Sequence, residues 1–165
     1  MYQRKWLAIC ALIVFLLDYI SKELAIKFLS DGPINVIGSF LRLKLVFNPG
    51  AAFSLASNAT IFLTVFAIGF AGVIFYFGRK VTSTPWAIAL GLTLGGIFGN
   101  LADRIFREPG RLQGEVVDWI AVPNWPVFNI ADSAVVCAAI LVMVLSVKNI
   151  DFYNSTKPED DRKDD

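Results

Sequence analysis

Long apolar runs, separated by more polar segments, make up most of this 165-residue chain. A helix needs roughly 20 apolar residues to cross the hydrocarbon core of a membrane. Four stretches are long enough, at about 6–28, 59–77, 82–102 and 130–147. The second and third contain no charged residue, and the fourth contains only Asp132, in its first turn. The pattern predicts a mainly α-helical membrane protein with four spanning helices.

A shorter pattern between the first two runs predicts β-structure. Residues 41–45 alternate between leucine and a basic residue, which is the period of a strand. The Asn-Pro-Gly sequence at 48–50 then predicts a turn, and residues 51–55 could form a second short strand. Another short run, 116–120, follows the third span. We expect a small antiparallel sheet that rests on the membrane surface.

The positions of lysine and arginine favour one orientation. Basic residues near the N-terminus and in the tight 79–85 loop lie directly beside a span, whereas those on the opposite side are spread over two long segments. Because cytoplasmic loops carry the concentrated basic residues, both termini are predicted to lie in the cytoplasm. Residues 1–150 are then a single membrane-embedded domain. Residues 151–165 are a polar cytoplasmic tail of a composition typical of disorder.

Composition excludes several classes of function. The chain is 56% hydrophobic and only 18% charged, with a mean hydropathy of +0.60, and its net charge of +1 gives no sign of a nucleic-acid partner. Cys10 and Cys137 both lie inside apolar runs, which favours small packing residues over a disulfide or a metal site. The chain has no histidine, so histidine-based nucleophilic machinery and the usual zinc sites are excluded.

A serine–lysine arrangement is left open by the absence of histidine. Ser21 and Lys22 are adjacent, but neighbours in a helix point about 100° apart and are poorly placed to share a proton. Acid–base chemistry by carboxylates is the remaining possibility.

Two aspartates are the main candidates for that chemistry. Asp118 lies in the 116–120 run, and Asp132 lies at the mouth of the last span. A carboxylate at the edge of a membrane is costly unless it has a partner, which makes it a functional candidate. Taken alone, Asp132 could simply satisfy a helix dipole and Asp118 could be an ordinary loop carboxylate. Together, they would be enough to activate a water molecule.

Further polar residues are spaced to share helix faces. Asp18 and Lys22 are four residues apart and can pair, as a structural ion pair or as part of a site. Asn129 and Asp132, three residues apart, also share a face.

The third span carries two such faces. Asn100 and Arg104 could hold a carbonyl or an acidic side chain, although Arg104 could instead extend to lipid headgroups. Gly91, Gly95 and Gly99 form a small-residue face, which favours close helix packing.

Five motifs in this order along the chain resemble those of the lipoprotein signal peptidases, the bacterial type II signal peptidases that are membrane aspartic endopeptidases. The motifs are Asp18-Tyr-Ile-Ser-Lys22, Asn48-Pro-Gly-Ala-Ala-Phe53, Gly95-Gly-Ile-Phe-Gly-Asn-Leu-Ala-Asp-Arg104, Val117-Asp118 and Phe128-Asn-Ile-Ala-Asp-Ser133. The resemblance implies a four-helix membrane bundle with a small antiparallel β-cradle on the outer surface.

The resemblance also implies roles for particular residues. Asp118 and Asp132 correspond to the catalytic pair. The residues that would surround the pair and the substrate are Asp18, Lys22, Asn48, Gly50, Asn100, Arg104 and Asn129. No metal and no cofactor are implied.

The implied reaction is removal of the signal peptide from a prolipoprotein, just before a cysteine that carries diacylglycerol. The enzyme would be a monomer in the bacterial cytoplasmic (inner) membrane, in contact with membrane lipids, with its site at the outer face. Two close carboxylates share one proton, so one aspartate would act as the base and the other would polarise the scissile carbonyl. The alternatives are a non-enzymatic lipid or peptide carrier, or a subunit of a larger complex that uses the glycine face as its contact.

Overall fold

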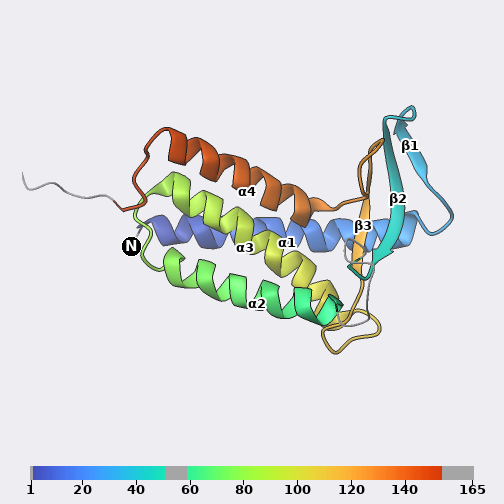
Figure 1. The fold of residues 1–165 in the computed structure, drawn as a ribbon. Helices are drawn as coiled ribbons and strands as arrows, with labels where there is room; N and C mark the ends of the chain where they lie inside the picture. The colour runs from blue at the N-terminus through green and yellow to red at the C-terminus, as the bar shows by residue number, and fades with distance from the viewer. Residues whose placement is uncertain (1, 51–58, 154–165) are drawn as a thin grey trace, which may run out of the picture.

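The computed structural model describes residues 2–50 and 59–153, which contain four long helices. These helices are α1 (Tyr2–Phe28), α2 (Ala59–Gly78), α3 (Thr84–Phe106) and α4 (Ile130–Val147). They lie side by side, with the sheet across one end (Figure 1). The predicted bounds hold closely for α2 and α4. However, α1 begins earlier than predicted, and α3 continues for one more turn, past residue 102.

Three of these helices are long and apolar enough to cross a membrane. They are α2 from Thr60, α3 and α4. The helix α1 has 27 residues but carries more charged side chains than the others, among them Asp18, Lys22 and Glu23. The predicted four spans are therefore confirmed for three helices.

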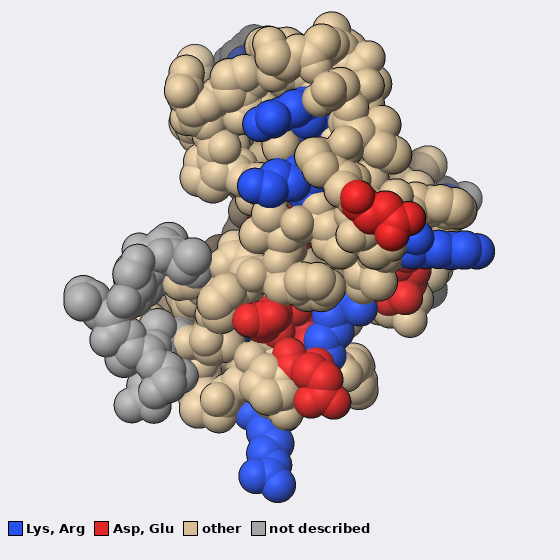
Figure 2. Space-filling model, turned by 90° about the vertical axis from the view of Figure 1, so that its right-hand side faces the viewer, with Lys and Arg blue, Asp and Glu red and all other residues tan. Residues whose placement is uncertain are grey.

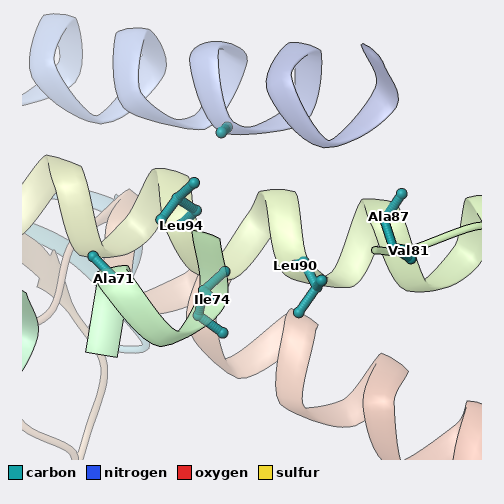
Figure 3. Packing of buried hydrophobic residues seen from close by; sticks show 7 residues of the cluster. Ala71, Ile74, Val81, Ala87, Leu90 and Leu94 are labelled. Atoms are coloured by element: carbon teal, nitrogen blue, oxygen red, sulfur yellow. The ribbon is translucent and has the colours of Figure 1, made fainter. Parts of the chain in front are cut away.

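Glycines on α3 allow it to pack closely against its neighbours. A Cβ on Gly95 would lie 2.7 Å from the backbone oxygen of Ala11 in α1, and a Cβ on Gly96 would lie 2.6 Å from the backbone oxygen of Ala131 in α4. The small-residue face therefore contacts α1 within the same chain, which removes the basis for treating it as a contact with another subunit. The apolar core lies mainly between α2 and α3, with Ala71, Ile74, Leu90 and Leu94 among its buried residues (Figure 3).

The strands form a three-stranded antiparallel sheet in the order β1-β2-β3. They are β1 (Ile34–Ile37), β2 (Leu41–Asn48) and β3 (Val116–Ala121). The predicted alternating strand is β2, and the 116–120 run is β3. The strand β1 was not predicted, and the predicted strand at 51–55 lies outside the described residues. Because β2 pairs with β3 in the register Asn48↔Val116, Asn48 lies close to the start of β3.

The chain after α4 turns back to the loop between α2 and α3. The Trp86 indole Nε1 donates a hydrogen bond of 2.8 Å to the backbone oxygen of Ile150. The ring of Phe152 packs on that of Trp86, with centroids 5.4 Å apart. Most of the predicted tail, residues 154–165, lies outside the described residues, so its disorder remains a prediction.

Candidate active site

The strand β3 places Asp118 in a buried position, and its carboxylate is held by two amide donors. Its side chain is only 2% exposed. Asn48 at the end of β2 donates to Asp118 Oδ2 at 2.8 Å, and Asn129 donates to Asp118 Oδ1 at 2.6 Å. Both oxygens of this carboxylate therefore have a side-chain donor.

Asp132 is fixed by the first turn of α4. Asn129 caps this helix: its Oδ1 accepts the Asp132 N–H at 2.9 Å, while Asp132 Oδ2 accepts the Asn129 N–H at 3.3 Å. This reciprocal pair is a capping box, which satisfies backbone donors that a helix start leaves free. The other oxygen, Asp132 Oδ1, accepts a hydrogen bond of 2.8 Å from Asn100 Nδ2 on α3.

Asn129 links the two aspartates directly. Its Nδ2 donates to Asp118, and its backbone N–H donates to Asp132. The same Nδ2 also lies 3.1 Å from Asn100 Oδ1. The two predicted carboxylates, one on β3 and one on α4, are therefore brought together within one hydrogen-bond network.

Burial changes the acidity of Asp118. It raises the pKa of this carboxyl from an ordinary value of 3.8 to about 6. The hydrogen bonds from Asn48 and Asn129 oppose this shift, and the negative charge of Asp132 adds to it. Asp118 is therefore largely ionised at neutral pH, yet its pKa lies close enough to the working pH for general-base chemistry.

Lys22 is the centre of a buried ionic cluster beside the aspartates. It is fully buried, and its Nζ lies 2.6 Å from Asp18 Oδ2 and 2.8 Å from Asp103 Oδ2. The third contact of Nζ is a hydrogen bond of 2.9 Å to Asn100 Oδ1. The predicted Asp18–Lys22 pair is therefore confirmed, and it connects to the site through Asn100.

Asp18 also contacts the start of α4. Its Oδ1 accepts the backbone N–H of Ala131 at 2.8 Å. Gly99 leaves room for this carboxylate, because a Cβ at that position would overlap Asp18 Oδ2. Asp18 therefore helps to hold the helix that carries Asp132.

Gly50 and Arg104 lie together at the edge of the site. Gly50 has a φ of +105°, a left-handed conformation that favours glycine, and its N–H donates to Asn48 Oδ1 at 2.8 Å. A Cβ on Gly50 would lie 4.0 Å from Arg104 Nη2. Arg104 Nη1 is buried and has no hydrogen-bond partner in the described part of the chain. A buried donor of this kind argues against an arginine that simply extends to lipid headgroups.

An apolar groove of about 420 Å³ opens beside Asp132. The loop after β3 and the outward face of α4 line it, through Val122, Trp125, Phe128, Ser133, Val136 and Cys137. An extended apolar group lying in this groove would contact one of the two candidate aspartates directly. The groove was not predicted from the sequence, because its two walls come from a loop and a helix face with no shared sequence pattern.

Exposed charged residues lie at the end of the molecule that carries the sheet. Figure 2 looks onto the end that carries the sheet and shows acidic and basic side chains together on this face. Among residues 2–50 and 59–153, no group of three or more histidine, cysteine, aspartate or glutamate side chains is suited to a metal ion. The expected absence of a cofactor remains a prediction.

Asp103 is part of this network, although it was not among the predicted site residues. It is 3% exposed and contacts Lys22, Arg107 and the backbone of Val117. Its spacing of four residues from Arg107 indicates an ion pair at the end of α3 and is the signal that was available.

The chain is similar to known proteins over most of its length. Residues 10–148 match the family described as signal peptidase (SPase) II. The lipoprotein signal peptidase of Streptomyces griseus is 50% identical over 152 residues, covering 90% of this chain and 78% of that protein. The lipoprotein signal peptidase of Mycobacterium tuberculosis is 48% identical over 143 residues, covering 86% of this chain and 71% of that protein.

Solved structures also resemble the chain. A bacterial membrane enzyme solved at 1.9 Å by the in meso method superposes with a TM-score of 0.76 at 28% identity, covering 86% of this chain and 92% of that one. A second such structure, at 2.3 Å, has a TM-score of 0.75.

Proposed function

The chain belongs to the signal peptidase II family of membrane aspartic proteases, and we propose that it removes the signal peptide from prolipoproteins by cutting just before a cysteine that carries diacylglycerol. The observation that carries this proposal is the pairing of Asp118 with Asp132 through Asn129. The relatives that support it are lipoprotein signal peptidases, and this chain matches them over most of their length.

The proposed chemistry uses the two aspartates as a dyad. One carboxylate, ionised, takes a proton from a water molecule whose oxygen attacks the scissile carbonyl carbon. The other, protonated, donates a hydrogen bond to the carbonyl oxygen. The carbon–nitrogen bond then breaks, and the departing amine of the lipidated cysteine receives the proton that the first aspartate took from the water. Because the two groups share one proton, the apparent pKa values belong to the pair.

The surrounding residues have supporting roles in this proposal. Asn48 and Asn129 hold Asp118, while Asn100 holds Asp132. Lys22 and Asp18 fix Asn100 and the start of α4, and Gly50 makes the turn that follows Asn48.

Arg104 is proposed to contact the substrate. It has a buried donor with no partner among the described residues, and substrate carbonyl oxygens are acceptors for such a group. The apolar groove beside Asp132 is proposed to take an apolar part of the substrate from the lipid.

We further propose that α1 is the fourth span. At 27 residues it is roughly 40 Å long, more than a bilayer core of about 30 Å requires. It exposes large apolar side chains such as Leu12 and Leu17, while the charges of Asp18 and Lys22 are buried against other parts of the chain.

This arrangement makes residues 1–150 one membrane-embedded peptidase domain of the bacterial cytoplasmic membrane. Both termini lie in the cytoplasm, the site lies at the outer face, and the enzyme acts as a monomer among membrane lipids. Arg79 and Lys80, at the end of the bundle away from the sheet, support this orientation.

Cleavage of a defined substrate tests the function. Purified protein in detergent is incubated with a diacylglyceryl-modified prolipoprotein and with the unmodified form as a control, and products are followed by gel shift. We expect a smaller product from the modified substrate only. A carrier would bind the substrate and release it uncut.

Labelling tests the orientation. In a variant whose Cys10 and Cys137 are replaced by alanine, a single cysteine at Ser39 should react with an impermeant thiol reagent from outside intact cells. A single cysteine at Thr82 should react only after permeabilisation. Reversed labelling would contradict an outer site.

A further inference from the structure

Asp103 is a buried carboxylate whose contacts extend in two directions. Its Oδ2 accepts from Lys22 Nζ at 2.8 Å and from the backbone N–H of Val117 at 3.2 Å. Its Oδ1 accepts from Arg107 Nε. Because Lys22 is on α1 and Val117 is on β3, this one side chain at the end of α3 joins three elements.

The first direction leads to Asp118. Val117 directly precedes it in β3 and is fully buried. The Val117 N–H is held by Asp103, and its carbonyl oxygen lies 3.4 Å from Asn129 Nδ2. The peptide that carries Asp118 is therefore held on both sides, at one end by the Asp103 carboxylate.

The loop before β3 closes tightly over the same position. The Gly114 N–H donates to the backbone oxygen of Arg104 at 3.0 Å. A Cβ on Gly114 would overlap the backbone oxygen of Asp103 and would lie 2.8 Å from that of Arg107. Gly114 therefore allows the chain that leads into β3 to pack directly against the backbone at the end of α3.

The second direction leads to Asp132. Asp103 and Asp18 hold the Lys22 ammonium between them, and this ammonium donates to Asn100 Oδ1 at 2.9 Å. Because the Asn100 oxygen accepts from Lys22, the amide group is oriented with its Nδ2 on the opposite side, free to donate to another acceptor. Asn100 Nδ2 is 2.8 Å from Asp132 Oδ1.

We propose that Asp103 is a positioning residue: from the end of α3 it fixes the positions of both aspartates of the dyad. This proposal rests on the proposed dyad. Asp103 itself contacts neither the substrate nor the reacting atoms, and it acts through Val117 on one side and through Lys22 and Asn100 on the other. A displacement of about 1 Å at a reacting group can lower a rate by roughly 100-fold.

The test is Asp103→Asn, which keeps the shape of the side chain and removes its charge. We expect kcat to fall by about 10- to 100-fold, with KM for the lipid-modified substrate within about twofold of wild type. The acidic limb of the pH–kcat profile should also move to lower pH. The reason is that the positive charge of Lys22 is less neutralised in this variant and favours ionised Asp118.

A matched control removes a carboxylate a short distance along the chain. Glu108→Gln makes the same chemical change at an exposed side chain in the turn after α3. Because an exposed charge is screened by solvent, kcat and the pH limb should both stay at wild-type values.

The outcomes separate positioning from a purely structural role. Wild-type kcat in Asp103→Asn overturns the proposal. A lower kcat with an unmoved pH limb also overturns it, because loss of folded protein lowers the rate at every pH equally.

If Asp103→Asn does not fold in detergent, Asp103→Glu decides the question. It restores the charge on a side chain one methylene longer, so we expect the wild-type pH limb with a reduced kcat. Wild-type kcat in Asp103→Glu overturns the proposal. Asp118→Asn is measured in parallel: activity in that variant rejects the dyad itself, whereas an inactive Asp118→Asn beside a fully active Asp103→Asn rejects only the role of Asp103.

Discussion

Replacing Asp118 with asparagine is the most informative perturbation of this protein. Asparagine has nearly the same volume, so no cavity forms, but it can neither ionise nor accept a proton from water. In the folded protein, Asn48 and Asn129 each donate to one Asp118 oxygen. An amide at this position keeps one acceptor and turns a donor toward the other amide. The lost hydrogen bond costs about 1–3 kcal/mol of folding stability.

A second effect opposes that loss. The pKa of Asp118 is raised from 3.8 to about 6, so the folded state disfavours the ionised carboxylate. A difference of about two pKa units lowers folding stability by up to about 3 kcal/mol above pH 6. This cost declines as the pH falls through 6 and is gone below pH 4, where the carboxyl is protonated in both states. Asparagine removes the cost entirely.

The two effects nearly cancel at neutral pH. Asp118→Asn should therefore insert and fold, with a Tm in detergent within a few degrees of wild type at pH 7. Below pH 4 only the lost hydrogen bond remains, so the variant should then be the less stable protein. Thermal unfolding at the two pH values checks both signs.

Activity should respond very differently. Asp118→Asn and Asp132→Asn should each lower cleavage of a lipid-modified substrate by about 10³-fold or more, and the double variant should be scarcely worse than either single variant. Groups that act as one catalytic unit lose most of their effect at the first deletion. Asp31→Asn, which changes an exposed carboxylate, is the control and should cleave normally.

Two results would refute the reasoning. If either single variant keeps most of its activity, the two aspartates do not act as a catalytic dyad. If each single variant loses only part of the activity and the losses add in the double variant, a carrier or a structural role is favoured. The wild-type rate should also fall about tenfold per pH unit below pH 6, if ionised Asp118 is the base. A rate that stays flat from pH 7 to pH 5 would assign the base elsewhere.

Two further predictions concern α3. Arg104→Lys should lower cleavage about tenfold or more with little change in membrane expression, because lysine keeps the charge but loses the planar set of donors; wild-type turnover would mean that Arg104 only contacts headgroups. Gly95→Ala should cost about 1–3 kcal/mol and lower the Tm, since its Cβ would lie 2.7 Å from the backbone oxygen of Ala11. The control is Gly69→Ala, because a Cβ at Gly69 would have no neighbouring atom within 4 Å, and this variant should keep the wild-type Tm. An equal loss of Tm in both variants would show that close helix packing at Gly95 is not the cause.

Local features of the sequence were enough to predict most of the elements. The lengths of the apolar runs predicted the positions of α2 and α4. A helix that crosses a membrane must form all its backbone hydrogen bonds internally and must span the fixed thickness of the hydrocarbon core. The leucine–basic alternation predicted β2. The strand β1 was missed because all four of its residues are exposed at the edge of the sheet, where no burial imposes an alternating pattern.

The site was predicted as a set of residue types, and the motif order that resembles the signal peptidases selected most of its members. Asp118 and Asp132 were chosen because carboxylates near a membrane are costly without a function. The residue type and its position relative to an apolar run are both properties of the sequence, so these two aspartates could be predicted without the fold.

The connections between those residues were decided by the tertiary structure. Nothing in the sequence indicates that Asn129 joins the two aspartates, or that Lys22 is shared between Asp18 and Asp103. These contacts join residues of α1, α3, β3 and α4, and the contact between Lys22 and Asp103 joins positions far apart in the sequence. Hydrogen bonds and ion pairs depend on distances of a few ångströms in space, and those distances exist only once the helices have packed and the sheet has closed over their ends.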